Sequence, residues 1–207
     1  KLNGPYVSLE DFKKSSAIYE TLTVDELHQI SPTYSLPMFP SSNSFGVFKK
    51  MTNFPRLSLN DISSWRARPD RELDSTLQKN LMNLSAEEIK DGLWPVYKGT
   101  SFKIWDGDTG KYYSWAYKDK AISWLYSKRL RSSKSSRDSV HKEFPENHIK
   151  KIETLPPFKP RIAFRKICRS TDSRTMICAL VPPNVFLQDG AQYILFPRGS
   201  ESDEAFL

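Results

Sequence analysis

The sequence predicts an α+β fold, with helices in the N-terminal half and a mostly antiparallel sheet in the C-terminal half. Two observations lead to this prediction. Early in the chain, Ser8 and Thr23 each precede acidic residues, as an N-cap precedes the first turn of a helix. After residue 90, apolar runs separated by short turns predominate, and strands joined by short turns pair antiparallel. With 207 residues and 38% hydrophobic content, the chain can bury a core.

The N-terminal half continues with extended and helical segments in alternation. Residues 31–43 contain three prolines and no apolar periodicity, so we expect an extended tract. Residues 44–51 have the pattern of a helix start, and residues 62–82 that of a strand followed by a partly helical segment. Ser85 and Glu88 have the spacing of a capping box.

The C-terminal half contains six expected strands, one helix and one long loop. The strands are apolar runs bounded by turn residues, at 93–96, 102–105, 111–116, 161–168, 175–183 and 192–199. The turn DGDTG would join the second strand to the third. Residues 117–131 have helical apolar spacing, and the serine-rich, basic residues 132–148 are expected to form a mobile loop.

The two cysteines predict no disulfide. Cys168 and Cys178 lie ten residues apart on one expected hairpin. If its turn centres near Thr171–Asp172, Cys178 lies opposite Arg165 and the two sulfur atoms miss each other. Two free thiols are typical of a reducing, cytoplasmic setting. The cysteines and the three histidines also lack zinc-site spacing, so we expect no metal.

Positive charge is concentrated in one part of the chain. Residues 98–174 hold 19 Lys and Arg against 8 Asp and Glu, a net charge of +11, whereas residues 1–97 hold 11 against 12. A basic block of this kind indicates a polyanionic partner, although lysine-rich loops also occur simply as solvated surface. No apolar run approaches the length of a membrane span, so no membrane partner is expected.

Motifs for enzymatic chemistry are missing. The sequence has no glycine-rich phosphate loop, no HExxH or CxxC metal motif and no GxSxG nucleophile elbow. The acids form no pair that the sequence alone can bring together. We therefore assign no catalytic residue.

Residues 93–116, LWPVYKGTSFKIWDGDTGKYYSWA, interleave aromatic and basic side chains. Three interpretations remain open, namely a nucleic-acid contact, a flat polar ligand such as a sugar, and core packing with a solvated rim. The candidate contacts are Lys98, Lys103, Lys111 and Tyr113. The residues most readily explained as core are Trp94, Phe102, Trp105 and Trp115. Arg161 and Arg165, four apart on one strand face, are either a basic stripe or ion-pair partners of N-terminal acids.

Five runs of the chain form an ordered series. They are LTVDELHQISPTYSLPMFPS, WRARPDRELDSTLQKNLM, WPVYKGTSFKIWDGDTGKYYSWA, PRIAFRKICRSTDSRTMICALVPPNVFL and QYILFPRGSESDEAFL. This series resembles the C-terminal part of large adenine-specific DNA methyltransferases, the single-chain type IIG restriction–modification enzymes and their phage-defence relatives. The family's glycine-rich cofactor motif, its Asn-Pro-Pro-Tyr-type motif and its nuclease motif are absent, and Lys166 stands where members often carry an acid.

The resemblance implies a fragment of a larger bacterial protein, which also fits a first residue that is not methionine. Residues 1–90 would be a helical and extended linker between methylase and recognition parts, and residues 91–207 a DNA target-recognition domain, truncated at its C-terminus. N6-adenine methylation and its cofactor, S-adenosylmethionine, would belong to the methylase domain of the parent chain, which is one expected partner.

The other expected partner is double-stranded DNA, gripped opposite the methylase domain. The expected phosphate contacts are Lys98, Lys103, Lys111, Lys128 and Arg129. The expected base-edge contacts, at the tip of a hairpin, are Arg169, Ser173 and Arg174, and Tyr113 and Arg165 complete the DNA-binding set. Residues 132–139 would become ordered only on DNA. The alternative is a non-catalytic scaffold or protein-interaction region of the same kind of protein.

Overall fold

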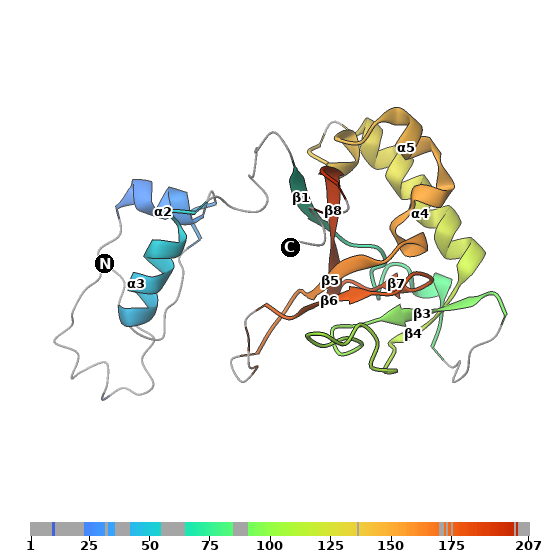
Figure 1. Cartoon of the computed structure of the whole chain (residues 1–207), viewed down its shortest axis with the longest axis horizontal. Coiled ribbons are helices and arrows are strands. Elements are labelled where there is room, and N and C mark those ends of the chain that lie inside the picture. The colour runs from blue at the N-terminus through green and yellow to red at the C-terminus, as the bar shows by residue number, and fades with distance from the viewer. Residues whose placement is uncertain are drawn as a thin grey trace. The chain divides into compact units, whose positions relative to one another are not determined.

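The structure is a computed structural model that describes residues 10, 23–31, 33–35, 42–54, 65–84, 91–135, 137–169, 172, 174, 176–200 and 202. The chain divides into two compact units, residues 1–59 and residues 60–207, and each is described by itself (Figure 1). Within the described residues, no helix is long and apolar enough to cross a membrane. The capping signals expected at Ser8 and at Ser85 with Glu88 lie outside the described residues.

The first unit contains the helices α2, Val24–Ile30, and α3, Ser42–Met51. The N-cap expected at Thr23 is confirmed as a full capping box. The Glu26 amide donates to the Thr23 hydroxyl at 3.1 Å, and the Thr23 amide donates to the Glu26 carboxylate at 2.9 Å. The same carboxylate accepts from the Lys49 ammonium at 2.5 Å, which ties α3 to the start of α2 and lowers the pKa of Glu26 to about 2.

The second unit is built on two four-stranded sheets, so the α+β class is confirmed. In the first sheet, all pairs are antiparallel and the order is β1 (Arg66–Asp70), β8 (Ala191–Arg198), β5 (Arg161–Arg165), β6 (Cys178–Val181). In the second sheet, the order is β2 (Met82–Asn83), β4 (Ser114–Tyr117), β3 (Leu93–Tyr97), β7 (Phe186–Leu187), and only β3 and β7 run parallel.

The second sheet lies between α4, Lys118–Lys134, and the first sheet. Because successive side chains of a strand point to opposite faces, Val96 and Phe186 pack with α4 around Leu125. Their neighbours Tyr97 and Leu187 instead join a core with residues of β5, β6 and β8. All four of these strand residues have no exposed surface, so the middle sheet is buried on both faces.

A buried ion pair connects the two sheets. Glu72 follows β1, and its carboxylate lies 2.7 Å from the guanidinium of Arg161, the first residue of β5. The other carboxylate oxygen accepts the Leu187 amide of β7 at 2.7 Å, and Arg161 donates to the Val185 carbonyl at 3.0 Å. Burial raises the pKa of Glu72, and the charge of Arg161 acts in the opposite direction. Of the two alternatives for Arg161, pairing with an N-terminal acid is therefore the one observed.

The distribution of elements differs from the expectation. Strands are spread over both halves, since β1 and β2 precede residue 91, although a strand at the start of residues 62–82 and the helix at 117–131 were each expected. The compact units divide between Leu59 and Asn60, so β1 and β2 belong to the same unit as residues 91–207. The physical reason is that β1 pairs along β8 near the end of the chain, and such long-range pairing is not visible in local patterns.

The helix expected at 117–131 is confirmed as α4, and the expected loop after it is largely structured. It contains the last turn of α4, the 3-10 helix η3 (Val140–Lys142) and the helix α5 (Glu146–Lys150). Arg68 of β1 holds this segment, because its guanidinium binds Asp138 at 2.8 Å and Glu143 at 2.9 Å. Three further 3-10 turns are η2 (Lys79–Leu81), η4 (Ile152–Thr154) and η5 (Pro156–Phe158).

The strand predicted at 102–105 is wrong. These residues belong to a loop between β3 and β4, which pair directly with each other. The backbone groups that a strand would use for a ladder are satisfied within the loop, since Lys103 and Asp106 bond each other through both N–H and C=O groups. DGDTG is therefore part of this loop and not a turn between two strands.

The predicted hairpin at 161–183 is confirmed, but its register is shifted by one residue. Cys178 lies opposite Phe164, not opposite Arg165. The observed register sets buried Ala163 opposite Ala179 on the inner face. A shift of one residue would move the buried side chains of one strand to the outer face of the sheet. Both cysteines are free, as predicted.

Candidate nucleic-acid interface

A closed loop of residues 98–111 leaves β3 and returns to β4. Ser101 is buried at its neck, where its hydroxyl accepts the Lys98 amide at 2.9 Å and donates to the Lys111 carbonyl at 2.5 Å. The Thr109 amide adds a bond to the Ser101 carbonyl at 2.9 Å. Next to Ser101, Phe102 has no exposed surface and anchors the loop in the core between the sheets. The loop is therefore a fixed part of the fold.

The loop carries three lysines whose side chains make no hydrogen bond or ion pair with any residue that the structure describes. Lys103 and Lys111 are exposed and Lys98 is half-buried. The two acids of the loop, in contrast, act as local caps. Asp108 accepts the Gly110 amide at 2.9 Å and the Tyr112 hydroxyl at 3.1 Å, and Asp106 accepts the Asp108 amide at 3.3 Å. The lysine charges thus remain available to a partner.

The loop packs against the β5–β6 hairpin. The Arg165 guanidinium donates to the Phe102 carbonyl at 3.3 Å, and the Arg165 side chain lies against Gly99. Further along, Gly107 lies against the backbone of Leu180 in β6, one of the two edge strands of its sheet. Arg165 is therefore half-buried under the loop and supports it.

The hairpin tip brings two further predicted contacts to the surface. Arg169 and Arg174 are both exposed. The Arg169 amide donates to the Asp172 carboxylate at 2.8 Å, which fixes one side of the turn. Ser173 lies outside the described residues.

Two of the predicted phosphate contacts are held within the fold. Arg129 is only 3% exposed, donates to the Thr154 hydroxyl at 2.9 Å and also bonds the Lys151 carbonyl. A guanidinium so enclosed cannot contact a DNA phosphate, so this expectation is wrong. Lys128 bonds the Arg71 carbonyl and lies 3.7 Å from the Asp70 carboxylate, so its charge is largely satisfied inside the protein. Helical periodicity places both residues on α4 but does not show which neighbours enclose them.

The aromatic residues of 93–116 fall into two groups. Phe102 and Trp115 are buried, as expected, and Trp94 packs on Phe158 and Phe186 with ring centroids 5.6 and 5.4 Å away. Trp105 is 98% exposed, so its assignment to the core is wrong. The predicted contact Tyr113 is half-buried against the core that includes α4. No flat, exposed cluster that would suit a sugar is formed by these residues.

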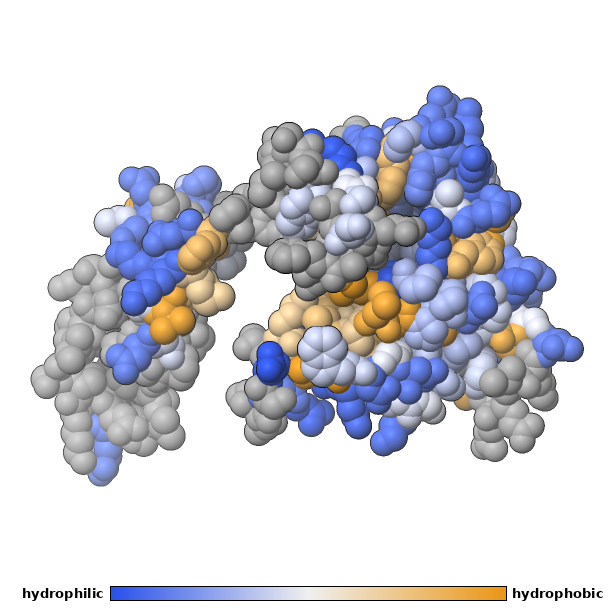
Figure 2. Space-filling view, viewed as in Figure 1, coloured by the Kyte–Doolittle hydropathy of each residue, from blue (hydrophilic) through white to orange (hydrophobic). Residues whose placement is uncertain are grey.

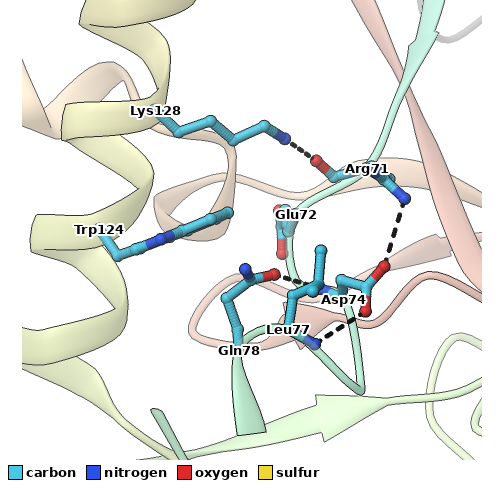
Figure 3. Close-up of a pocket in the computed structure, with 7 residues that line it drawn as sticks. All are labelled: Arg71, Glu72, Asp74, Leu77, Gln78, Trp124 and Lys128. Atoms are coloured by element: carbon cyan, nitrogen blue, oxygen red, sulfur yellow. Dashed lines mark hydrogen bonds and ion pairs between the residues drawn. The ribbon is translucent and has the colours of Figure 1, made fainter. Parts of the chain in front are cut away.

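The cavity in Figure 3 is a second polar site, distant from the loop in sequence. It measures about 200 Å³ and is lined by Arg71, Glu72, Asp74, Leu77, Gln78, Trp124 and Lys128. Lys128 and Trp124 point into it from α4, and the Lys128 ammonium meets the Arg71 carbonyl (Figure 3). Charges of both signs balance within the lining, and the volume is below the roughly 300–1,000 Å³ of most ligand sites. We interpret the cavity as structural.

Asp70, which lies 3.7 Å from the Lys128 ammonium, is contacted by two buried side chains. The Tyr193 hydroxyl donates to its carboxylate at 3.1 Å, and the His141 ring nitrogen lies 3.3 Å from the same oxygen. Burial opposes ionisation of Asp70, but the contacts with His141 and Lys128 outweigh it and hold the pKa of Asp70 below its ordinary value. Burial raises the pKa of Tyr193 well above its ordinary value.

The raised pKa of Tyr193 predicts a loss of stability at alkaline pH. Above about pH 10, an unfolded chain loses this proton while the folded protein keeps it. The free energy of unfolding therefore keeps its full value below that pH. Above it, the free energy of unfolding falls by about 1.4 kcal/mol per pH unit until the pH reaches the pKa of Tyr193 in the folded protein. Urea unfolding between pH 9 and 11 measures this slope. Tyr193→Phe should make it shallower, although not flat because burial also raises the pKa of Tyr97. An equal slope in wild type and variant would contradict the prediction.

Comparison of the chain with protein-family models, with curated proteins and with solved structures finds no match. The described residues also contain no cluster of three or more His, Cys, Asp and Glu side chains that could hold a metal ion. The case for a function therefore depends on the chain's own residues. Two features were not foreseen from the sequence, the choice of buried Glu72 as the partner of Arg161 and the exposure of Trp105. Neither has a local signal, because partner and exposure are both set by distant parts of the chain.

Proposed function

We propose that this chain is a DNA target-recognition region of a large adenine-specific DNA methyltransferase of the type IIG restriction–modification kind. One observation carries the proposal. A rigid loop holds Lys98, Lys103 and Lys111 without acidic partners beside a hairpin with two exposed arginines. Loops of this kind suit phosphate contacts, which position a protein on a duplex, while arginines of a hairpin tip suit contacts with base edges.

The proposal that the chain belongs to this family rests on the ordered series of five sequence runs. On this proposal the second unit would be the recognition domain, and the antiparallel β5–β6 hairpin would contact the base edges. Methyl transfer would be supplied by another domain of the parent chain. The cavity in Figure 3 does not suit S-adenosylmethionine, because it is small and its lining carries balanced charges in place of a glycine-rich turn. We therefore assign no step of methyl transfer to this chain.

Binding of a labelled 25-base-pair duplex, followed by fluorescence anisotropy between 50 and 200 mM NaCl, tests the proposal. We expect affinity to fall steeply with salt, because each phosphate contact releases counterions. Combining Lys103→Ala with Lys111→Ala should weaken binding to all sequences and reduce the slope of log K against log salt by about 2.

A matched control pair is Lys142→Ala with Lys151→Ala. Both lysines are exposed and lie near α5, at the other end of the second unit from β3 and β4 (Figure 1). The control pair should retain wild-type affinity. An affinity that does not depend on salt, or an equal loss in both pairs, would refute the DNA interface.

The second candidate function is a protein-interaction scaffold, and a specific observation favours it. Ile167, Met176 and Leu180 on the β5–β6 hairpin are 77%, 52% and 63% exposed. Figure 2 shows hydrophobic colours gathered over this part of the second unit. Exposed apolar patches of this kind mark binding surfaces in many proteins. The salt titration separates the two candidates, since an apolar contact would depend little on ionic strength.

A further inference from the structure

Trp105 lies at the tip of the 98–111 loop, where its side chain contributes nothing to the buried core. Its side chain is 98% exposed, whereas large aromatic side chains are mostly buried. Its backbone has φ +67°, in the left-handed region that a bulky L-residue rarely adopts. Two unfavourable features in one residue point to a role outside the folded chain.

The turn around Trp105 shows how unusual this choice of residue is. Lys103 and Asp106 bond each other through N–H and C=O groups at 2.8 and 3.0 Å, so Ile104 and Trp105 are the two corner residues. Only the second corner has positive φ, which is the pattern of a type II turn. Glycine or asparagine normally takes that position, because neither suffers the steric penalty. Trp105 therefore occupies a site where glycine would be easier to accommodate.

The backbone on both sides of Trp105 is held in place, so the loop keeps this residue at the surface. The buried Phe102 and the contact of Gly107 with Leu180 hold the loop on both sides of the turn. Because the loop backbone is held, binding through Trp105 needs to order only the two side-chain torsions of the ring, which makes it an efficient anchor.

We propose that Trp105 stacks on an unstacked or unpaired base of DNA held by the 98–111 loop. This inference rests on the proposed function. Lys103 belongs to the same four-residue turn as Trp105, so a DNA backbone that this lysine contacts would run close to the ring. Every base has a flat face, and aromatic side chains stack on such faces or wedge between base steps. The indole would thus supply the non-ionic part of binding and the lysines the ionic part.

The test compares Trp105→Ala, Trp105→Phe and Trp105→Gly on a fully paired 25-base-pair duplex and on the same duplex with one unpaired 2-aminopurine. Wild type should bind the second duplex more tightly and change its 2-aminopurine fluorescence. Trp105→Ala should bind it about ten-fold more weakly and lose the preference, and Trp105→Phe should lie between. The salt slope should not change, because the substitution removes no charge.

Thermal melting distinguishes a binding role of Trp105 from a structural one, because the two roles predict opposite changes in melting temperature. Trp105→Gly relieves the positive φ and should leave the melting temperature unchanged or raise it by a few degrees. A clear decrease would mean that Trp105 supports the fold, and would overturn the inference.

The remaining outcomes are also decisive. If Trp105→Ala binds both duplexes like wild type while affinity stays salt-dependent, the stacking role is wrong and the DNA interface stands. If wild type binds no duplex, the proposed function fails and the stacking role with it. If Trp105→Ala changes only self-association in sedimentation velocity, the residue is a protein contact and the inference is overturned.

Discussion

Arg161→Ala is expected to lower the free energy of unfolding by about 3–5 kcal/mol, because it leaves a buried carboxylate without its counter-ion. Glu72 is 1% exposed and Arg161 is 3% exposed, so water cannot replace the lost partner. The substitution also removes the donor to the Val185 carbonyl and to the Pro156 carbonyl, which lie 3.0 and 3.2 Å away. Urea unfolding followed by tryptophan fluorescence measures the change.

Glu72→Gln tests the same pair more mildly. The amide oxygen can still accept the Leu187 amide, but the charge that Arg161 faces is removed, so we expect a smaller loss than for Arg161→Ala. This variant keeps the test informative if Arg161→Ala does not fold. The matched control is Lys150→Ala, which breaks the exposed ion pair of Lys150 with Glu146 and should change the urea midpoint little. Equal midpoints for Arg161→Ala and wild type would show that the buried pair does not hold the sheets together.

Gly107→Ala is expected to destabilise the second unit by about 1–3 kcal/mol and to weaken DNA binding at the same time. A Cβ atom at residue 107 would overlap the Leu180 carbonyl oxygen of β6. Because this oxygen belongs to a strand of the sheet, it cannot move aside as a flexible side chain can. The loop must shift away instead, and Lys103 and Lys111 move with it.

Gly99→Ala is the matched control in the same loop. A Cβ atom there would lie 3.4 Å from the Arg165 side chain and 3.5 Å from the Gly190 carbonyl oxygen, which are ordinary van der Waals distances. We expect stability and affinity close to wild type for this variant. Urea unfolding and duplex anisotropy measured on both glycine variants check the prediction. If Gly107→Ala behaves like Gly99→Ala, the loop is not held by its contact with β6.

Local sequence signals correctly predicted the elements that neighbouring residues specify. Thr23 caps α2 because Glu26 follows three residues later, and α4 follows the apolar spacing of residues 117–131. The β5–β6 hairpin follows from two apolar runs with a turn between them, although its register was one residue off. The exposed cations Lys103, Lys111, Arg169 and Arg174 also fall in the segment of highest positive charge.

Tertiary structure decided everything that depends on distant partners. The sequence by itself determined that this is an α+β chain with a basic block and free cysteines. It could not show that Arg161 meets Glu72, since the two are brought together by the pairing of β1 and β5 with β8 in the first sheet. Nor could it separate buried Arg129 from exposed Lys103, or Trp115 in the core from Trp105 in solvent. The physical reason is that a residue type sets what a side chain can do, whereas its burial and neighbours, which are properties of the whole fold, set what it does.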